Sequence, residues 1–261
     1  MIAGGVCHRQ FPQGDACIPL AVEWKSDSMP NEHISKQFDV ELETIRTRVL
    51  QMGGLVEQQI GNAVQALLDG DTDRLSQVMA DDVQVNAMEV RLDEECQLII
   101  ARRQPAARDL RMVMTVIKTI TDLERIGDEA EKIARVGKSM LEGDRVFVPR
   151  LREIEKMAEV ATSMLRRALD AFARLDAQGA LDVARQDRLL DEEFSANLRQ
   201  LITFMMEDPR TISMSLDTIF IAKAIERIGD HAKNLAEYVV YLVKGKDIRH
   251  VSLEDVERQG L

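Results

Sequence analysis

The words Glu124-Arg-Ile-Gly-Asp128 and Glu226-Arg-Ile-Gly-Asp230 repeat one five-residue pattern 102 positions apart (226 − 124). A spacing this long indicates that one small domain occurs twice, because solenoids repeat over much shorter periods. Each word falls inside a long helix-like stretch, so its two acids lie at i and i+4 on one face. Like charges at this spacing destabilise a helix by about 0.2–0.5 kcal/mol, and an interior glycine costs about 1 kcal/mol more. Our hypothesis is that a bound metal ion offsets this cost in both copies.

Composition narrows the class of protein. Of the 261 residues, 45% are hydrophobic but only 4% are aromatic, which favours helix-on-helix packing over a β-sandwich or barrel. The net charge of −11 argues against a nucleic-acid-binding protein, which needs a basic face. No apolar run approaches the roughly 20 residues that span a bilayer, and the three cysteines show no C-x-x-C spacing. We therefore expect a soluble, cytoplasmic, all-α protein.

The N-terminal residues differ from the rest of the chain. Residues 1–28 contain several glycines and prolines and the single tryptophan, without helical or strand periodicity. A signal peptide would need a basic start and a continuous apolar centre, and neither is present. Because Met29-Pro30 resembles a natural chain start, we expect residues 1–33 to be a disordered or non-native extension.

From Phe38 onward, apolar residues recur every three or four positions, which is typical of amphipathic helices. Glycine, proline and capping residues interrupt this pattern at 69–72, 104–105, 143–149, 178–179 and 208–209. Long helices with short connections pack antiparallel. The sequence therefore predicts two similar antiparallel three-helix bundles in tandem, at 34–143 and 148–246, with a polar tail at 247–261. The six expected helices cover 38–68, 72–103, 105–141, 150–177, 180–206 and 209–243.

Polar side chains interrupt the apolar stripes of these helices where a core residue would be expected. In the first half, a turn near Pro105 brings antiparallel residues whose numbers sum to about 210 to one level. Asn86 then faces Glu124, and Asp82 faces Asp128. Glu89 lies on the same face of its helix as Asp82 and Asn86. Two oxygen-bearing side chains are therefore expected opposite two others.

The second half repeats this arrangement around a turn at 208–209. Asp187 is expected opposite Asp230, and Asp191 opposite Glu226. Clusters of carboxylate and amide oxygens suit a hard cation such as magnesium, and manganese, iron or zinc is also compatible. The predicted metal ligands are Asp82, Asn86, Glu89, Glu124, Asp128, Asp187, Asp191, Glu226 and Asp230.

Neighbouring residues admit simpler explanations. Any single acid could belong to a solvated helix face with weak ion pairs, but the coincidence of four at one level in both repeats favours a metal site. Arg125 and Arg227 are expected to neutralise the acids partly, and Gly127 and Gly229 to permit close helix approach. His231 follows Asp230 directly and so points about 100° away, which makes it a poor candidate ligand.

Several longer motifs occur in order along the chain: Met52-Gly-Gly-Leu-Val-Glu57, Gln104-Pro-Ala-Ala-Arg-Asp-Leu-Arg111, Leu123-Glu-Arg-Ile-Gly-Asp128, Met206-Glu-Asp-Pro209 and Ile225-Glu-Arg-Ile-Gly-Asp-His231. Together they resemble the PhoU family of bacterial phosphate-signalling regulators, over about residues 33–250. The resemblance implies a negative regulator of the phosphate regulon, without enzyme activity. Such a protein is an adaptor that couples the Pst phosphate transporter, through its ATPase subunit, to a PhoR-type sensor histidine kinase and restrains uptake and starvation signalling. It also implies a homodimer that meets the membrane only through partners.

The resemblance further implies multinuclear metal clusters at the paired E/D-x-x-x-D words, here Glu124, Asp128, Glu226 and Asp230. Because Lys233 stands where the first half has Glu131, we expect the first site to bind metal more tightly. The alternative is a ferritin-like metal-storage or oxidase bundle. That class needs Glu-x-x-His on two helices, a pattern that this sequence lacks. A purely structural helical protein would not need acids within its core stripes.

Overall fold

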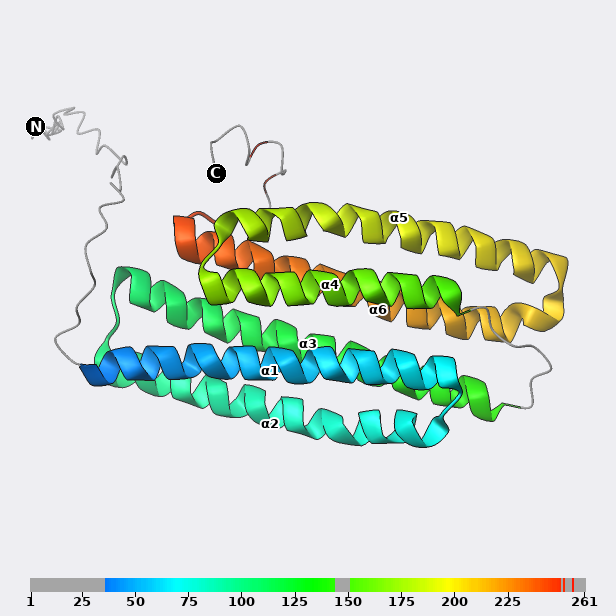
Figure 1. Cartoon of the computed structure of the whole chain (residues 1–261), viewed down its shortest axis with the longest axis horizontal. Helices are drawn as coiled ribbons and strands as arrows, with labels where there is room; N and C mark the ends of the chain where they lie inside the picture. The colour runs from blue at the N-terminus through cyan, green and yellow to red at the C-terminus, as the bar shows by residue number, and fades with distance from the viewer. Residues whose placement is uncertain (1–35, 144–150, 250, 252–254, 256–261) are drawn as a thin grey trace, which may run out of the picture. The chain divides into compact units, whose positions relative to one another are not determined.

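The computed structural model describes residues 36–143, 151–249, 251 and 255. The expected N-terminal extension at 1–33, residues 148–150 and most of the expected C-terminal tail lie outside this range. Within it the chain is all helical and contains no strand, which confirms the predicted fold class (Figure 1). The elements are α1 (Lys36–Asp69), α2 (Thr72–Arg103), α3 (Ala107–Glu142), α4 (Arg152–Arg174), α5 (Ala177–Glu207), the short 3-10 helix η1 (Pro209–Thr211) and α6 (Ile212–Lys244).

The turn between the first two helices of each half is built in the same way. Asp71 caps α2 by accepting a hydrogen bond from the Arg74 amide at 3.0 Å. Asp176 caps α5 by accepting from the amides of Gln178 and Gly179, each at 3.0 Å. An aspartate at this position satisfies amides that the first helical turn leaves without partners.

The second of these turns corrects the expected break at 178–179. Gly179 belongs to the first turn of α5, and Leu175, with φ of 55°, takes the left-handed conformation at the end of α4. The aspartate cap therefore decides where α5 begins, and the glycine two residues inside the helix does not.

Helices α1–α3 pack together, as do α4–α6, and the two bundles meet through α3 with α6 and α1 with α4 (Figure 1). Contacts across α3 and α6 run antiparallel: Lys118 lies against Tyr238, whereas Glu129, further along α3, pairs with Arg227. Buried aliphatic side chains fill the core, and Cys96 is one of its small members. Among the described helices, none has the length and apolar character that a membrane crossing requires.

Candidate metal centres at the acidic words

Asp82 anchors the first acidic band, which we define as Asp82, Asn86, Glu89, Glu124 and Asp128. The side chain of Asp82 is buried on α2, and its two oxygens accept hydrogen bonds from different amides. Gln59 Nε2 donates to Oδ1 at 2.9 Å, and Asn86 Nδ2 donates to Oδ2 at 3.0 Å. The band is thus tied to α1 as well as to its own helix.

Gly127 makes room for this arrangement on α3. A Cβ atom at Gly127 would lie 3.2 Å from Asp82 Oδ1 and 3.3 Å from Gln59 Oε1. Only a residue without a side chain lets α3 approach so close to the Asp82 carboxylate without displacing it. The expectation that this glycine permits close helix approach is confirmed.

Two buried oxygens of this region have no hydrogen-bond partner among the described residues, namely Gln59 Oε1 and Asn86 Oδ1. Both amides turn their nitrogens toward Asp82, which leaves the oxygens as acceptors without donors. A buried acceptor without a partner costs about 1–3 kcal/mol. A cation would satisfy such oxygens, so these residues fit a site for a hard metal ion.

Electrostatics in the first band point the same way. Burial, followed by the charges of Asp128, Glu89 and Asp82, raises the pKa of Glu124. Burial and the neighbouring Asp82 likewise raise the pKa of Asp128. Glu124 and Asp128 therefore lie close enough to Asp82 for their charges to interact, as the predicted antiparallel level implies. The nearby Arg125 opposes this increase at Glu124 only in part, and the remaining negative charge is what a bound cation would neutralise.

The second acidic band comprises Asp187, Asp191, Glu226 and Asp230. One oxygen each of Asp187, Asp191 and Asp230 lies within 4.8 Å of the other two, with Asp187 buried and the other two exposed. Among the described residues, no other group of three potential metal-ligating side chains comes this close together. Burial and the charges of Glu226 and Asp187 raise the pKa of Asp230 to about 6.

Two lysines distinguish the second band from the first. Lys233 Nζ donates to Asp187 Oδ2 at 2.6 Å, and Lys223 Nζ donates to Glu226 Oε2 at 2.5 Å. In both ion pairs the positive charge comes from a lysine of α6. The expectation that the first band binds metal more tightly stays a prediction, although the closest approach of three carboxylates occurs in the second.

Arg227 forms an ion pair outside its own band, a contact that the sequence did not predict. Its Nη1 atom lies 3.0 Å from Glu129 Oε1 on α3, so the pair links the two bundles. Arg125 lies on α3 with its Nη1 3.9 Å from Asp122 Oδ1. Position on the helical wheel could not show that Arg227 faces a second bundle.

A buried polar network between α3 and α6 was absent from the sequence predictions. His231 Nδ1 donates to Asp122 Oδ1 at 2.7 Å, and Asn234 Nδ2 donates to the same oxygen at 3.4 Å. Asp122 and His231 are both buried. The sequence signal was the proximity of each to an acidic word, since Asp122 precedes Glu124 by two residues and His231 follows Asp230.

Comparison with known proteins shows which family the chain is similar to. The PhoU domain model matches the chain twice, at residues 49–136 and 154–239. The phosphate-specific transport system accessory protein PhoU homolog of Pseudomonas aeruginosa is 49% identical over 230 residues, which are 87% of this chain and 93% of that protein. The corresponding Escherichia coli K12 accessory protein is 46% identical over 228 residues, 87% of this chain and 94% of that protein.

Solved structures agree with these relatives. The crystal structure of PhoU from Pseudomonas aeruginosa matches with a TM-score of 0.77 at 49% identity, over 80% of this chain and all of that one. The phosphate transport system regulatory protein PhoU from Streptococcus pneumoniae matches with a TM-score of 0.74 at 27% identity, over 81% of this chain and 99% of that one. Accessory and regulatory proteins of this kind are not enzymes. Since the family model matches both bundles and close relatives align over nearly their whole length, the chain belongs to the PhoU family.

Proposed function

We propose that this protein is a negative regulator of the phosphate regulon. It is a cytoplasmic adaptor that couples the Pst transporter, through its ATPase subunit, to a PhoR-type sensor kinase, and it restrains phosphate uptake and starvation signalling. The observation that carries this proposal is the 46–49% identity to accessory proteins of the phosphate-specific transport system, over 93–94% of their length. Relatives this similar over a whole chain normally share the surfaces that bind partners. We further propose that the working form is a homodimer.

The two acidic bands are the second part of the proposal. The first band would hold a metal ion through Asp82, Glu89, Glu124 and Asp128, with the Asn86 oxygen as an additional neutral ligand. The second would use Asp187, Asp191, Glu226 and Asp230. When bound, the cation supplies positive charge that neutralises the acids and cross-links neighbouring helices. Magnesium, manganese, iron and zinc are the candidates.

The support for metal sites comes from features that a solvated acidic face would not need. Buried amide oxygens without donors surround Asp82, and burial raises the pKa of Glu124, Asp128, Asp191 and Asp230. Each of these features destabilises the metal-free protein, and a cation relieves all of them. In each band one aspartate is buried against neighbouring helices, Asp82 in the first and Asp187 in the second, whereas Asp128, Asp191 and Asp230 are exposed. Their role in the proposed adaptor is to hold neighbouring helices together.

A complementation experiment tests the regulatory role. The chain is expressed in an Escherichia coli K12 strain that lacks its 46% identical accessory protein, with a reporter fused to a phosphate-starvation promoter. We expect the reporter to be repressed in phosphate-rich medium and induced on starvation. The empty vector is the control, and constant expression despite soluble, folded protein would contradict the proposal.

A binding experiment tests the partners separately. The purified chain is mixed with the detergent-solubilised Pst transporter or with the cytoplasmic part of the kinase from the same source, and complex formation is measured by size-exclusion chromatography with light scattering. We expect both mixtures to form complexes. Sedimentation of the chain alone reports whether it is a dimer.

A further inference from the structure

Helix α4 is much shorter than its counterpart α1, with 23 residues against 34. Both helices end two residues before a capping aspartate, Asp71 or Asp176, so the difference lies at the N-terminus of α4. The following helices, α2 and α5, have nearly the same length, with 32 and 31 residues. The hairpin of α5 and α6 therefore extends beyond the first turn of α4 by about three turns, or roughly 16 Å (Figure 1).

In the first bundle, the N-terminal turns of α1 cover the corresponding end of the α2–α3 hairpin. Phe38 and Ile45 of α1 are buried in the core there. Glu41 accepts two hydrogen bonds from Arg103 at the end of α2, at 2.9 and 2.7 Å. The first bundle thus shows that a helix occupies this position and that an ion pair fixes its end.

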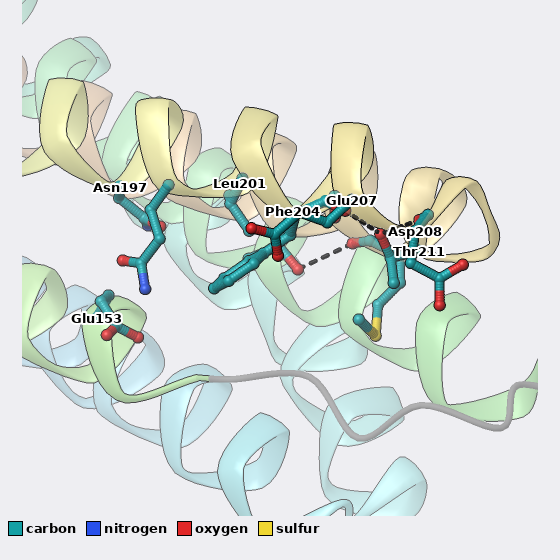
Figure 2. A pocket seen from close by; sticks show the side chains of 11 residues that line it. Glu153, Asn197, Leu201, Phe204, Glu207, Asp208 and Thr211 are labelled. Atoms are coloured by element: carbon teal, nitrogen blue, oxygen red, sulfur yellow. Dashed lines mark hydrogen bonds between the residues drawn. The ribbon is translucent and has the colours of Figure 1, made fainter.

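In the second bundle this position contains a pocket of about 200 Å³. Glu153 in the first turn of α4 closes one end of it, and the α5–η1–α6 turn closes the other (Figure 2). We call it the α5–α6 groove. Its apolar side chains are Leu201, Phe204 and Met214, and its polar ones include Asn197, Ser215 and Thr218.

The polar side chains occupy positions that are apolar in the first bundle. Acidic positions of α5 follow those of α2 by 105 (187 − 82), and α6 follows α3 by 102 (226 − 124), so Asn197 corresponds to Leu92 and Thr218 to Val116. Leu92 and Val116 are buried core residues. Asn197 is also buried, yet the hydrogen bond shown for its amide is one to Met157 Sδ at 3.8 Å. The groove is therefore suited to an occupant that brings polar as well as apolar groups.

Charge at the groove is reversed relative to the first bundle. Glu207 corresponds to Arg102 by the same offset. Glu153 and Asp208 are the other two acids of the lining, and Asp208 is paired with Arg210. In the first bundle, a basic hairpin end meets the acidic Glu41 of α1. By the same charge complementarity, the acidic end of the α5–α6 hairpin favours a basic helix at the position that the N-terminal turns of α1 occupy in the first bundle.

We propose that the α5–α6 groove is the docking site for a basic amphipathic helix of a partner protein. The helix lies end to end with α4 and completes the second bundle over its last three turns. Apolar side chains at i, i+4 and i+7, the spacing of Phe38, Leu42 and Ile45 in α1, contact Leu201, Phe204 and Met214. A lysine or arginine near its end pairs with Glu207. This inference rests on the asymmetry of the two bundles and does not depend on metal binding or on repression.

A peptide derived from this chain tests the proposal. The probe is a labelled peptide with the sequence of residues 36–50 in which Glu41→Lys and Glu43→Lys replace two of the three acids. Binding to the full-length protein is measured by fluorescence anisotropy. Because three turns bury little surface, we expect saturable binding with Kd on the order of 10–100 μM.

Two variants and a control locate the binding. Phe204→Ala should weaken binding at least about tenfold, since aromatic anchors dominate such contacts. Glu207→Lys should reverse the charge preference, so that the unmodified peptide, which keeps Glu41 and Glu43, binds better than the basic one. Val83→Ala, at a 69% exposed apolar residue of α2, should leave binding unchanged. Circular dichroism checks that each variant is folded.

Two results would overturn the proposal. One is the absence of saturable binding, as expected if the groove holds only water or is covered by the chain itself. The other is a dimer of the free protein that dissociates with Phe204→Ala in sedimentation, because a second copy would then be the occupant. Loss of repression in the complementation experiment leaves this measurement unaffected, so the two hypotheses fail separately.

Discussion

His231 of α6 donates a hydrogen bond to Asp122 of α3 across 2.7 Å, and this buried pair joins the two bundles between their acidic words. Arg227 and Glu129 form a second link along the same helices. Each linking residue lies one or two positions from an acid of one of the bands. The contact between the bundles is thus built from the same helical turns as the candidate metal sites.

Removing His231 should destabilise the protein. With His231→Ala, the Asp122 carboxylate stays buried and loses the 2.7 Å hydrogen bond from His231, which costs about 1–3 kcal/mol in the free energy of unfolding. Urea denaturation of His231→Ala, Asp122→Asn and the double variant measures their coupling. Arg125→Ala is the matched control, because that side chain is exposed and 3.9 Å from the same oxygen. Strictly additive effects would show that the pair does not interact energetically.

Adjacent glycines of α1 should respond in opposite directions to alanine. A Cβ at Gly53 would lie 2.5 Å from Leu169 Cδ1 and 2.7 Å from Cδ2, whereas one at Gly54 would meet nothing within 4 Å. Gly53→Ala should therefore destabilise by about 1–3 kcal/mol through overpacking against α4. Gly54→Ala should stabilise by about 0.5–1 kcal/mol through helix propensity. Thermal and urea unfolding measure both, and equal effects of one sign would contradict the close α1–α4 contact.

Metal content should depend on each band independently. Protein purified from metal-replete medium should contain metal by elemental analysis. The double variants Glu124→Ala/Asp128→Ala and Glu226→Ala/Asp230→Ala should each lose the metal that one band binds. Graded dialysis against a chelator should empty the second band first, because Lys233 and Lys223 supply competing positive charge there. Wild-type protein without metal would exclude both sites, and earlier loss from the first band would reverse their expected order.

The metal-free protein should lose stability as pH rises through about 4 to 6. Burial and neighbouring acids raise the pKa of Asp230 to about 6 from an ordinary value of 3.8. The folded state therefore binds more protons than the unfolded state in this window, and the free energy of unfolding falls with pH. Above about pH 6 this contribution is constant. Asp230→Asn should reduce the slope, which is measured by chemical denaturation after chelation.

Metal binding should show the opposite dependence on pH. Protons compete with the cation for Asp230, so affinity should increase as pH rises from about 4 to 6 and then level off. Titration of metal into chelated protein at several pH values measures this increase. Affinity that is constant across the window would show that Asp230 is not a ligand.

Much of the fold follows from local patterns in the sequence. Apolar residues every three or four positions define the helices, and Asp71, Pro105 and Pro209 lie where one helix gives way to the next. The facing of Asp82 with Asp128 follows from antiparallel geometry alone, because a short turn fixes which residues share a level. Asp176 was a local signal for the start of α5, but the nearby Gly179 led us to predict the break two to three residues too late.

Only the tertiary structure decided how the two halves meet. The sequence by itself determined the helices, their hairpins and the acidic faces, because periodicity and turn chemistry act over a few residues. It did not show that Asp122 and Arg227 face the other bundle, because contacts between distant helices depend on how whole surfaces pack. The same holds for the ion pair of Lys233 with Asp187, and for the α5–α6 groove, which exists because α4 begins late relative to the hairpin beside it.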